Sequence, residues 1–302
     1  MISLKNIKRF KIKILNIIII YLFIVDSYYI KKSAKTSICL CVIGKSENLY
    51  AKEYVNHYKK LGYNHIYVYD NNNFNGERLS DILFEEIKNG FVSIIDFIGY
   101  RGKKNNSQYE SYYDCYKKNK RNYDWLSFFD FDEYLVINSK TIQEFLDNKI
   151  YTKCQNIKIN WLMYNSYRES LYYENKPLNK RFIKPFFNDS GNQHIKSTVR
   201  GNLPKNYWRK WLNPHSSGYN ITSCSSSGKY IDSKTPFVYP PDYKKAFLKH
   251  FYKKSFEEYC LKLKRGWPDQ ADNIHVINDL IKSNKNNEEK IKIINKIFNL
   301  TK

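Results

Sequence analysis

The chain has 302 residues, with 51 Lys and Arg against 29 Asp and Glu, so its formal net charge is +22. That length allows one large domain or two small ones with a substantial core. The positive charge indicates either an anionic partner or a solvated, lysine-rich surface. The chain has no basic tail, no RNP-like aromatic repeat and no zinc-finger spacing, which argues against the common nucleic-acid-binding classes.

The six cysteines include no CxxC pair, so we expect no zinc site. Cys39 and Cys41 are two residues apart in an apolar run and share one face of a predicted strand, where we expect buried thiols. The number of cysteines neither requires nor excludes disulfides.

The first residues resemble a membrane-targeting segment. Residues 1–13 are basic, residues 14–25 (ILNIIIIYLFIV) are apolar, and Asp26 interrupts the run. Twelve residues are fewer than the roughly 20 that span a bilayer, so a signal-anchor, a cleaved signal, an amphipathic surface helix and an ordinary core helix all remain open. We expect a single-pass signal-anchor with a cytosolic N-terminus, of the Golgi type if the source is eukaryotic.

Patterns of strand and helix alternate from residue 37. Apolar runs bounded by turn residues predict strands, and apolar residues at helical spacing that end on glycine predict helices. The predicted strands are 37–44, 65–70, 91–97 and 124–130, and the predicted helices are 47–62, 76–90 and 106–122. This alternation predicts an α/β fold, a Rossmann-like and mostly parallel sheet with helices on both faces.

The pattern changes after residue 150. One more strand is predicted at 156–164, and loops rich in Pro, Asn, Ser and Gly dominate 174–242. Helices are predicted at 254–265 and 286–299. We therefore expect an elaborated, loop-rich second half within one domain.

Acidic residues interrupt the apolar stretch YDWLSFFDFDEYLVI. Asp130 ends the predicted strand, and in extended geometry Asp132 faces the same side. Ligands of an open parallel sheet bind beyond the carboxyl ends of its strands. Two carboxylates there suit Mg²⁺ or Mn²⁺, which would also compensate the cost of burying the acids.

Two other predicted strands are also followed by polar residues. Asp70 ends its strand, and the turn that follows, which contains Asn72, offers amide groups to a base or ribose. Glu47 follows the first strand, where it can cap a helix or contact a nucleotide.

An ordered set of motifs resembles glycosyltransferase family 92 and related family 2-type enzymes of the GT-A fold. The motifs are KSENLYAKEYVNHYKKLGYNHIYVYDNNNFNGE, DWLSFFDFDEYL, KINWLMYNS, PLNKRF, HIKSTVRG, NPH and LKHFYKKSFEEYCLKLKRG, between about residues 37 and 267. The resemblance implies a GT-A domain at 34–267 with a loop-rich acceptor half. We therefore expect three parts: the membrane-associated segment 1–33, this domain, and a charged helical extension at 268–302.

The resemblance also implies roles for particular residues. The metal would be bound by Asp130, Asp132 and His250. The nucleotide-sugar would be contacted by Glu47, Asp70 and Asn72, and its diphosphate would be bound by Lys196 and Arg200. No catalytic base is assigned; Asp189, Glu174 and Glu133 are candidates. Tyr164, Tyr167, Trp208 and Trp211 are aromatic residues that can stack on sugar rings.

The expected function is metal-dependent transfer of a hexose from a nucleotide-sugar to a hydroxyl of a glycan or glycoconjugate, with inversion at the anomeric carbon. The resemblance implies that the donor is a UDP-sugar, and UDP-galactose is a guess from the family. We expect no nucleic-acid partner. A nucleotidyltransferase is a weaker hypothesis, because VIGKSEN after the first strand carries only one Gly and one Lys. The sequence is also compatible with a basic nucleic-acid-binding protein and with a degenerate, non-catalytic relative of the family.

Overall fold

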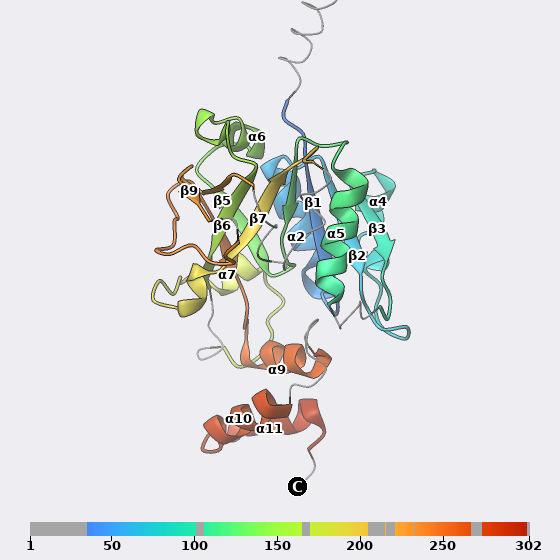
Figure 1. The fold of residues 1–302 in the computed structure, drawn as a ribbon. Helices are drawn as coiled ribbons and strands as arrows, with labels where there is room; N and C mark the ends of the chain where they lie inside the picture. The colour runs from blue at the N-terminus through green and yellow to red at the C-terminus, as the bar shows by residue number, and fades with distance from the viewer. Residues whose placement is uncertain are drawn as a thin grey trace, which may run out of the picture. The chain divides into compact units, whose positions relative to one another are not determined.

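A computed structural model describes residues 35–100, 106–164, 170–204, 215, 221–232, 234–266 and 274–300 (Figure 1). Its strands are β1 (Ile38–Gly44), β2 (His65–Asp70), β3 (Val92–Asp96), β4 (Trp125–Phe128), β5 (Glu133–Ile137), β6 (Asn156–Met163), β7 (Ile195–Arg200), β8 (Ser223–Ser225), β9 (Tyr230–Ile231) and β10 (Ala246–His250). Its helices are α2 (Asn48–Leu61), α3 (Leu79–Ile82), α4 (Phe84–Lys88), α5 (Ser107–Asn119), α6 (Ile142–Leu146), α7 (Leu178–Arg181), α9 (Phe256–Arg265), α10 (Ile274–Asn284) and α11 (Glu288–Phe298), with 3₁₀ turns η2 (Lys149–Tyr151) and η3 (Ser190–Gln193).

The strands of the described chain form one sheet in the order β3-β2-β1-β4-β7-β6-β10-β5, with β8 beside β6 and β9 beside β8. Strands β3, β2, β1 and β4 are all parallel, as predicted. Beyond β4 the sheet is mixed, because β7 is antiparallel to both β4 and β6, while β10 is parallel to β6 and antiparallel to β5. The fold is therefore α/β, with a parallel half and a mixed half.

Helices cover both faces of the parallel half. Alternate residues of β1 belong to two different cores: Leu40 and Val42 lie in the core with α2, and Cys39 and Cys41 lie in the core with α5. Figure 1 shows α5 in front of these strands. Because both faces of β1 are covered, its sequence is a continuous apolar run and does not alternate with polar residues.

The predicted elements differ from the structure in several places. The helix predicted at 76–90 is two short helices, α3 and α4, which break at Leu83. The helix predicted at 286–299 is α11, and α10, which was not predicted, precedes it; both pack with α9 in an apolar cluster around Ile294 and Leu263. Among the described residues no helix is both long and apolar enough for a membrane span, and the apolar segment 14–25 lies outside those residues.

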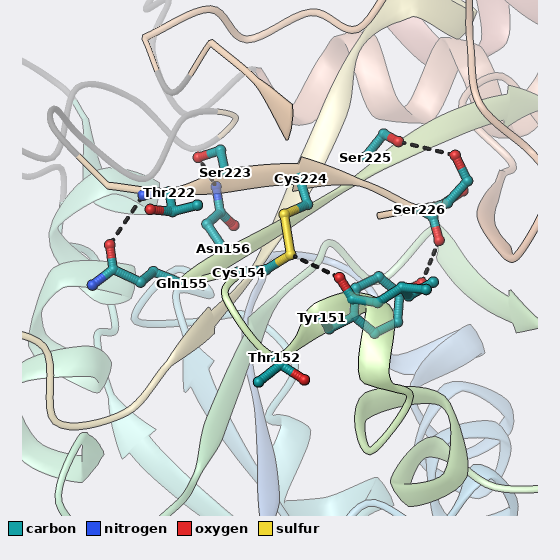
Figure 2. The surroundings of a disulfide bond; sticks show 12 residues. Tyr151, Thr152, Cys154, Gln155, Asn156, Thr222, Ser223, Cys224, Ser225 and Ser226 are labelled. Carbon is teal, nitrogen blue, oxygen red and sulfur yellow. Dashed lines mark hydrogen bonds between the residues drawn. A yellow bond between two sulfur atoms is a disulfide. The ribbon is translucent and has the colours of Figure 1, made fainter. Parts of the chain in front are cut away.

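Two disulfides join segments that are far apart in the sequence. Cys41 of β1 is bonded to Cys115 of α5, so the prediction of a free buried thiol is wrong for Cys41, whereas Cys39 is a free buried thiol. The second disulfide joins Cys154, just before β6, to Cys224 of β8, and Figure 2 shows Tyr151 beside it. The Tyr151 hydroxyl donates a hydrogen bond to the carbonyl of Ser226 (Figure 2).

Candidate active site

The candidate site lies where the strand order reverses. Strands β2 and β3 follow β1 on one side, whereas β4 pairs with β1 on the other side. In open α/β sheets this reversal leaves a crevice at the carboxyl ends of the two central strands, where ligands bind. Residues 129–133, which we call the acid loop, follow β4 at that end, and residues 45–47 follow β1.

The acid loop is a closed turn. The backbone N–H of Glu133 donates to the carbonyl of Asp130 at 3.0 Å, and the backbone N–H of Asp130 donates to Oε2 of Glu133 at 3.0 Å. The predicted extended geometry of Asp130 and Asp132 is therefore wrong. Phe131 between them is buried, and a Cβ added at Gly44 would lie only 2.6 Å from its ring. Glycine at the end of β1 thus lets the acid loop approach that strand.

Asp130 is held by side chains from α5 and β7. The Tyr112 hydroxyl donates to Oδ1 of Asp130 at 2.6 Å, Gln108 donates to the same oxygen, and Nζ of Lys196 lies 2.8 Å from Oδ2. Lys196 is fully buried and also lies 3.6 Å from Oε1 of Glu133. Lys196, the predicted diphosphate ligand, is therefore the buried counter-charge of Asp130 and Glu133.

Asp132, Glu133 and His250 form a group that could hold a metal ion. One ligand atom from each lies within 4.8 Å of the others, and all three residues are buried. The pairing of β10 with β5 sets His250 opposite Glu133, and Nε2 of His250 lies 3.5 Å from Oδ1 of Asp132. Asp130 is not in this group, and Glu133 takes the place that was predicted for it.

The donor atoms of this group fit a divalent cation. Oε1 of Glu133 and Nδ1 of His250 are buried without a hydrogen-bond partner among the described residues, so the group has unused ligand capacity. Two carboxylates and an imidazole suit Mn²⁺, and the imidazole favours it over Mg²⁺, which prefers oxygen ligands.

Electrostatics separate the three acids. Burial raises the pKa of the Asp132 carboxyl, but Lys262 and then His250 outweigh burial and bring it well below its usual value. Burial also raises the pKa of the Asp130 carboxyl, but the positive charge of Lys196 and the hydrogen bonds of the carboxyl together outweigh burial, so this pKa is lowered as well. Burial together with both aspartates raises the pKa of Glu133 well above its usual value, in spite of Lys196. The loop therefore combines two ionised aspartates with one carboxyl that holds its proton more tightly.

The His250 imidazole is the nitrogen donor of the group. Burial lowers its pKa, and the attraction of Asp132 only partly offsets that effect. A neutral imidazole is the form that binds metals. The Trp161 ring packs against it, with 4.1 Å between ring centroids, and fixes its position at the end of β10.

Glu47 faces cations that sequence reasoning missed. Its side chain does not cap α2 but lies 2.6 Å from Nη1 of Arg265 and 3.6 Å from Nζ of Lys254. Lys262, one turn before Arg265 on α9, lies 2.8 Å from Oδ2 of Asp132. The i, i+3 spacing of two cations on a predicted helix was the signal that could have revealed them.

Asp70 and Asn72 hold the backbone beside the site. Oδ1 of Asp70 accepts hydrogen bonds from the backbone and side-chain nitrogens of Asn72, and Oδ2 accepts one from the backbone N–H of Leu79. Oδ1 of Asn72 accepts from the backbone N–H of Ser46 at 2.7 Å. Both residues are buried, and their side chains position the loop after β1.

Arg200 is not brought to the acids. Antiparallel pairing sets Arg200 opposite Trp125, at the start of β4, whereas Lys196 lies near the end of β4. The four residue steps from Lys196 to Arg200 span about 13 Å in a strand. The Arg200 guanidinium stacks on the Trp125 ring at 4.2 Å and donates to the carbonyl of Cys154. The predicted diphosphate role of Arg200 therefore does not fit this site.

The candidate bases lie in three settings. Asp189 caps η3 by accepting from the backbone N–H of Gly191 at 2.8 Å. Glu174 is exposed and pairs with Lys176 at 3.0 Å. Glu133 is buried within the acid loop. Of the predicted aromatic platform, Tyr164 is buried, and the remaining members, Tyr167, Trp208 and Trp211, lie outside the described residues.

Comparison with protein families matches residues 34–233, more than half of the chain, to glycosyltransferase family 92. No curated protein matches the chain.

Several solved structures are similar to the chain at low identity. One is the mannosyltransferase PcManGT from Pyrobaculum calidifontis in complex with GDP-Man and Mn²⁺, with 10% identity over 45% of this chain and a TM-score of 0.30; the match spans only 38% of that protein's length. Another is residues 1–349 of TarS from S. aureus, with 11% identity, 87% of this chain, 71% of that chain and a TM-score of 0.40. The complex of the same TarS fragment with UDP has 10% identity over the same shares of the two chains and a TM-score of 0.40.

Proposed function

The chain belongs to glycosyltransferase family 92 and is a glycosyltransferase, and from that premise we propose a metal-dependent hexosyltransferase. It moves a hexose from a UDP-sugar to a hydroxyl of a glycan or glycoconjugate, with inversion at the anomeric carbon. The observation that carries the proposal is the group of Asp132, Glu133 and His250 at the carboxyl end of the sheet, where open α/β sheets bind ligands.

The acid loop and β10 would hold the metal. Asp132, Glu133 and His250 would be its ligands, and when bound the cation supplies positive charge against the diphosphate leaving group. The buried ammonium group of Lys196 would keep Asp130 ionised and would hold the acid loop in place through this ion pair. Glu47, Asp70 and Asn72 would shape the nucleotide side of the crevice, because they hold the segment that follows β1.

Inversion requires a base on the acceptor side. The bond from the anomeric carbon to the diphosphate oxygen breaks, a bond to the acceptor oxygen forms, and the hydroxyl proton passes to the base. Asp189, Glu174 and Glu133 remain the candidates. Glu133 is the least suited of them, because it is assigned to the metal group, is fully buried and accepts a hydrogen bond from the backbone N–H of Asp130.

The test is release of free nucleotide from a panel of sugar nucleotides, with Mn²⁺ and with EDTA. We expect release from one donor that needs the metal and falls about 100-fold or more in Asp132→Asn, since a charged ligand is lost from the site. Asp279→Asn is the control, because Asp279 is exposed on α10, a helix that carries none of the assigned site residues. Undiminished turnover in Asp132→Asn rejects the metal assignment.

We also propose that residues 14–25 anchor the protein in a membrane, with residues 1–13 in the cytosol. The two disulfides support this orientation, because disulfides persist mainly in oxidising compartments. Removing residues 1–33 should move the protein from the membrane fraction to the soluble fraction. A full-length chain that is already soluble without detergent contradicts the anchor.

A further inference from the structure

A pocket beside the acid loop is lined by α9, the residues just before that helix, the loop after β1 and the start of α2. Four cations line it against two carboxylates, Glu47 and Glu258, and Glu258 is paired with Arg181. The lining residues are Ser46, Glu47, Leu49, Tyr50, Tyr252, Lys253, Lys254, Glu258, Leu261, Lys262 and Arg265. Such a pocket is suited to an anion, because several ammonium and guanidinium groups converge on one volume.

Three of the lining cations are paired with acids of the site. Nζ of Lys254 lies 3.6 Å from Oε2 of Glu47. Nζ of Lys262 lies 2.8 Å from Oδ2 of Asp132, and Nη1 of Arg265 lies 2.6 Å from Oε1 of Glu47. The side chains of Lys262 and Arg265 are 15% and 21% exposed, whereas those of Lys254, Asp132 and Glu47 are 7%, 7% and 6% exposed. Lys262 and Arg265 are therefore the more accessible cations of these pairs, and Glu47 lines the pocket with them.

The helix that carries the cations is fixed at its first turn. Ser255 and Glu258 form a capping box, and both oxygens of Glu258 accept from the guanidinium of Arg181. Because α9 is held in this way, Lys262 and Arg265 project from a rigid element. Lys264 lies on the same helix with the same charge but is exposed and does not line the pocket.

We propose that Lys262 and Arg265 bind the diphosphate of the nucleotide-sugar, and that Asp132 and Glu47 hold them in position when no donor is present. A diphosphate presents anionic oxygens that accept charge-assisted hydrogen bonds, and the guanidinium can bind two of them at once. This inference deepens the proposed function and depends on it. It replaces Lys196 and Arg200, which the fold commits to other contacts.

The test uses the full chain and three probes: inorganic pyrophosphate, UDP and GDP. Calorimetry in EDTA measures their binding to wild type, Lys262→Met, Lys262→Arg, Arg265→Met and Lys264→Met. Losing one charge-assisted contact should weaken pyrophosphate binding about tenfold in Lys262→Met and Arg265→Met. Lys262→Arg should keep most of the affinity, and Lys264→Met should match wild type. Thermal unfolding of each variant shows that it is folded.

The outcomes separate this inference from the proposed function. If wild type binds a nucleoside diphosphate and the Lys262→Met and Arg265→Met variants bind it equally well, only the assignment of the two cations is overturned. Wild type that binds none of the three probes, with or without Mn²⁺, overturns the assignment and the proposed function together. An equal loss in Lys264→Met also overturns the assignment, since it shows an effect of overall charge.

Discussion

Lys262 contacts the Asp132 carboxylate, which belongs to the candidate metal group. Its Nζ lies 2.8 Å from Oδ2 of Asp132, and the same carboxylate belongs to the group with Glu133 and His250. A divalent cation and an ammonium group would therefore compete for Asp132 in the donor-free protein. This competition concerns metal affinity alone and can be measured without any substrate.

We expect Lys262→Met to bind Mn²⁺ about fivefold more tightly than wild type in the absence of nucleotide, because the competing charge is gone. The electron paramagnetic resonance signal of free Mn²⁺ measures the affinity, and Lys264→Met is the control on the same helix. A merely structural role for Lys262 predicts the opposite, weaker Mn²⁺ binding in a loosened site. Unchanged or weaker binding in Lys262→Met therefore contradicts competition.

Lys158 is a buried cation outside the active site, on β6. Its Nζ donates to the carbonyls of Asp232 and Thr235 at 2.7 and 2.6 Å. Burial lowers the pKa of Lys158 from 10.5 to about 8, and Asp232 only partly opposes burial. Between these two values the unfolded chain binds more protons than the folded chain, so this residue makes stability rise with pH.

The free energy of unfolding of wild type relative to Lys158→Met should rise by about 2 kcal/mol between pH 8 and pH 9.5. Urea unfolding of both proteins at the two pH values measures the difference, and all other titrating groups cancel in the comparison. A constant difference between the proteins shows that the pKa of Lys158 is the same in the folded and unfolded chains.

Sequence spacing located some site residues and misplaced others. Asp132 was predicted from its place after a buried strand, and Asp130 lies beside it, but their partners come from α5, β7, β10 and α9. No local pattern reports such long-range pairing. Lys196 and Arg200 lie on the same face of a strand, because side chains of a strand alternate between its two faces. This alternation does not predict which end of the strand lies near the acid loop.

At the scale of elements, a buried ion pair joins α9 to α7. The side chains of Arg181 and Glu258 are 3% and 6% exposed, and Tyr50 donates to Glu258 as well. Arg181 lies on α7 and Glu258 on α9, so the pair joins the helix to the body of the domain. Removing one member leaves the other as an uncompensated buried charge.

We expect Arg181→Met to lower the free energy of unfolding by about 3–5 kcal/mol. The matched control is Lys176→Met, which breaks the exposed pair with Glu174 and should cost no more than about 1 kcal/mol. Urea unfolding followed by circular dichroism gives both values. Equal effects of the two substitutions would show that the pair between α7 and α9 does not stabilise the fold.

Local periodicity predicted the elements of the parallel half well. The predicted strand 65–70 coincides with β2, and α2 ends at its glycine, Gly62, as predicted. Strands β5, β7 and β10 were not predicted; in β7 (IKSTVR) and β10 (AFLKH) polar residues interrupt the apolar ones, so neither forms an apolar run. The first of them, β5, begins at Glu133, inside the stretch whose pattern indicates a single strand that ends in acidic residues.

At the scale of the whole molecule, the two disulfides reinforce different halves of the sheet. Cys41–Cys115 joins β1 to α5 in the parallel half, and Cys154–Cys224 joins the start of β6 to β8 in the mixed half. Their sequence separations are 74 and 70 residues. Cross-links that close loops of this length remove much of the conformational freedom of the unfolded chain.

Each disulfide should therefore contribute about 4 kcal/mol to the free energy of unfolding in the chain-entropy description. The double variant Cys154→Ala/Cys224→Ala tests this value by urea unfolding, with Cys260→Ala as a control that removes a buried thiol but no cross-link. Labelling of wild type in urea without reductant should modify only Cys39 and Cys260. Modification of all six cysteines would contradict both disulfides, and with them the oxidising compartment that the proposed membrane orientation requires.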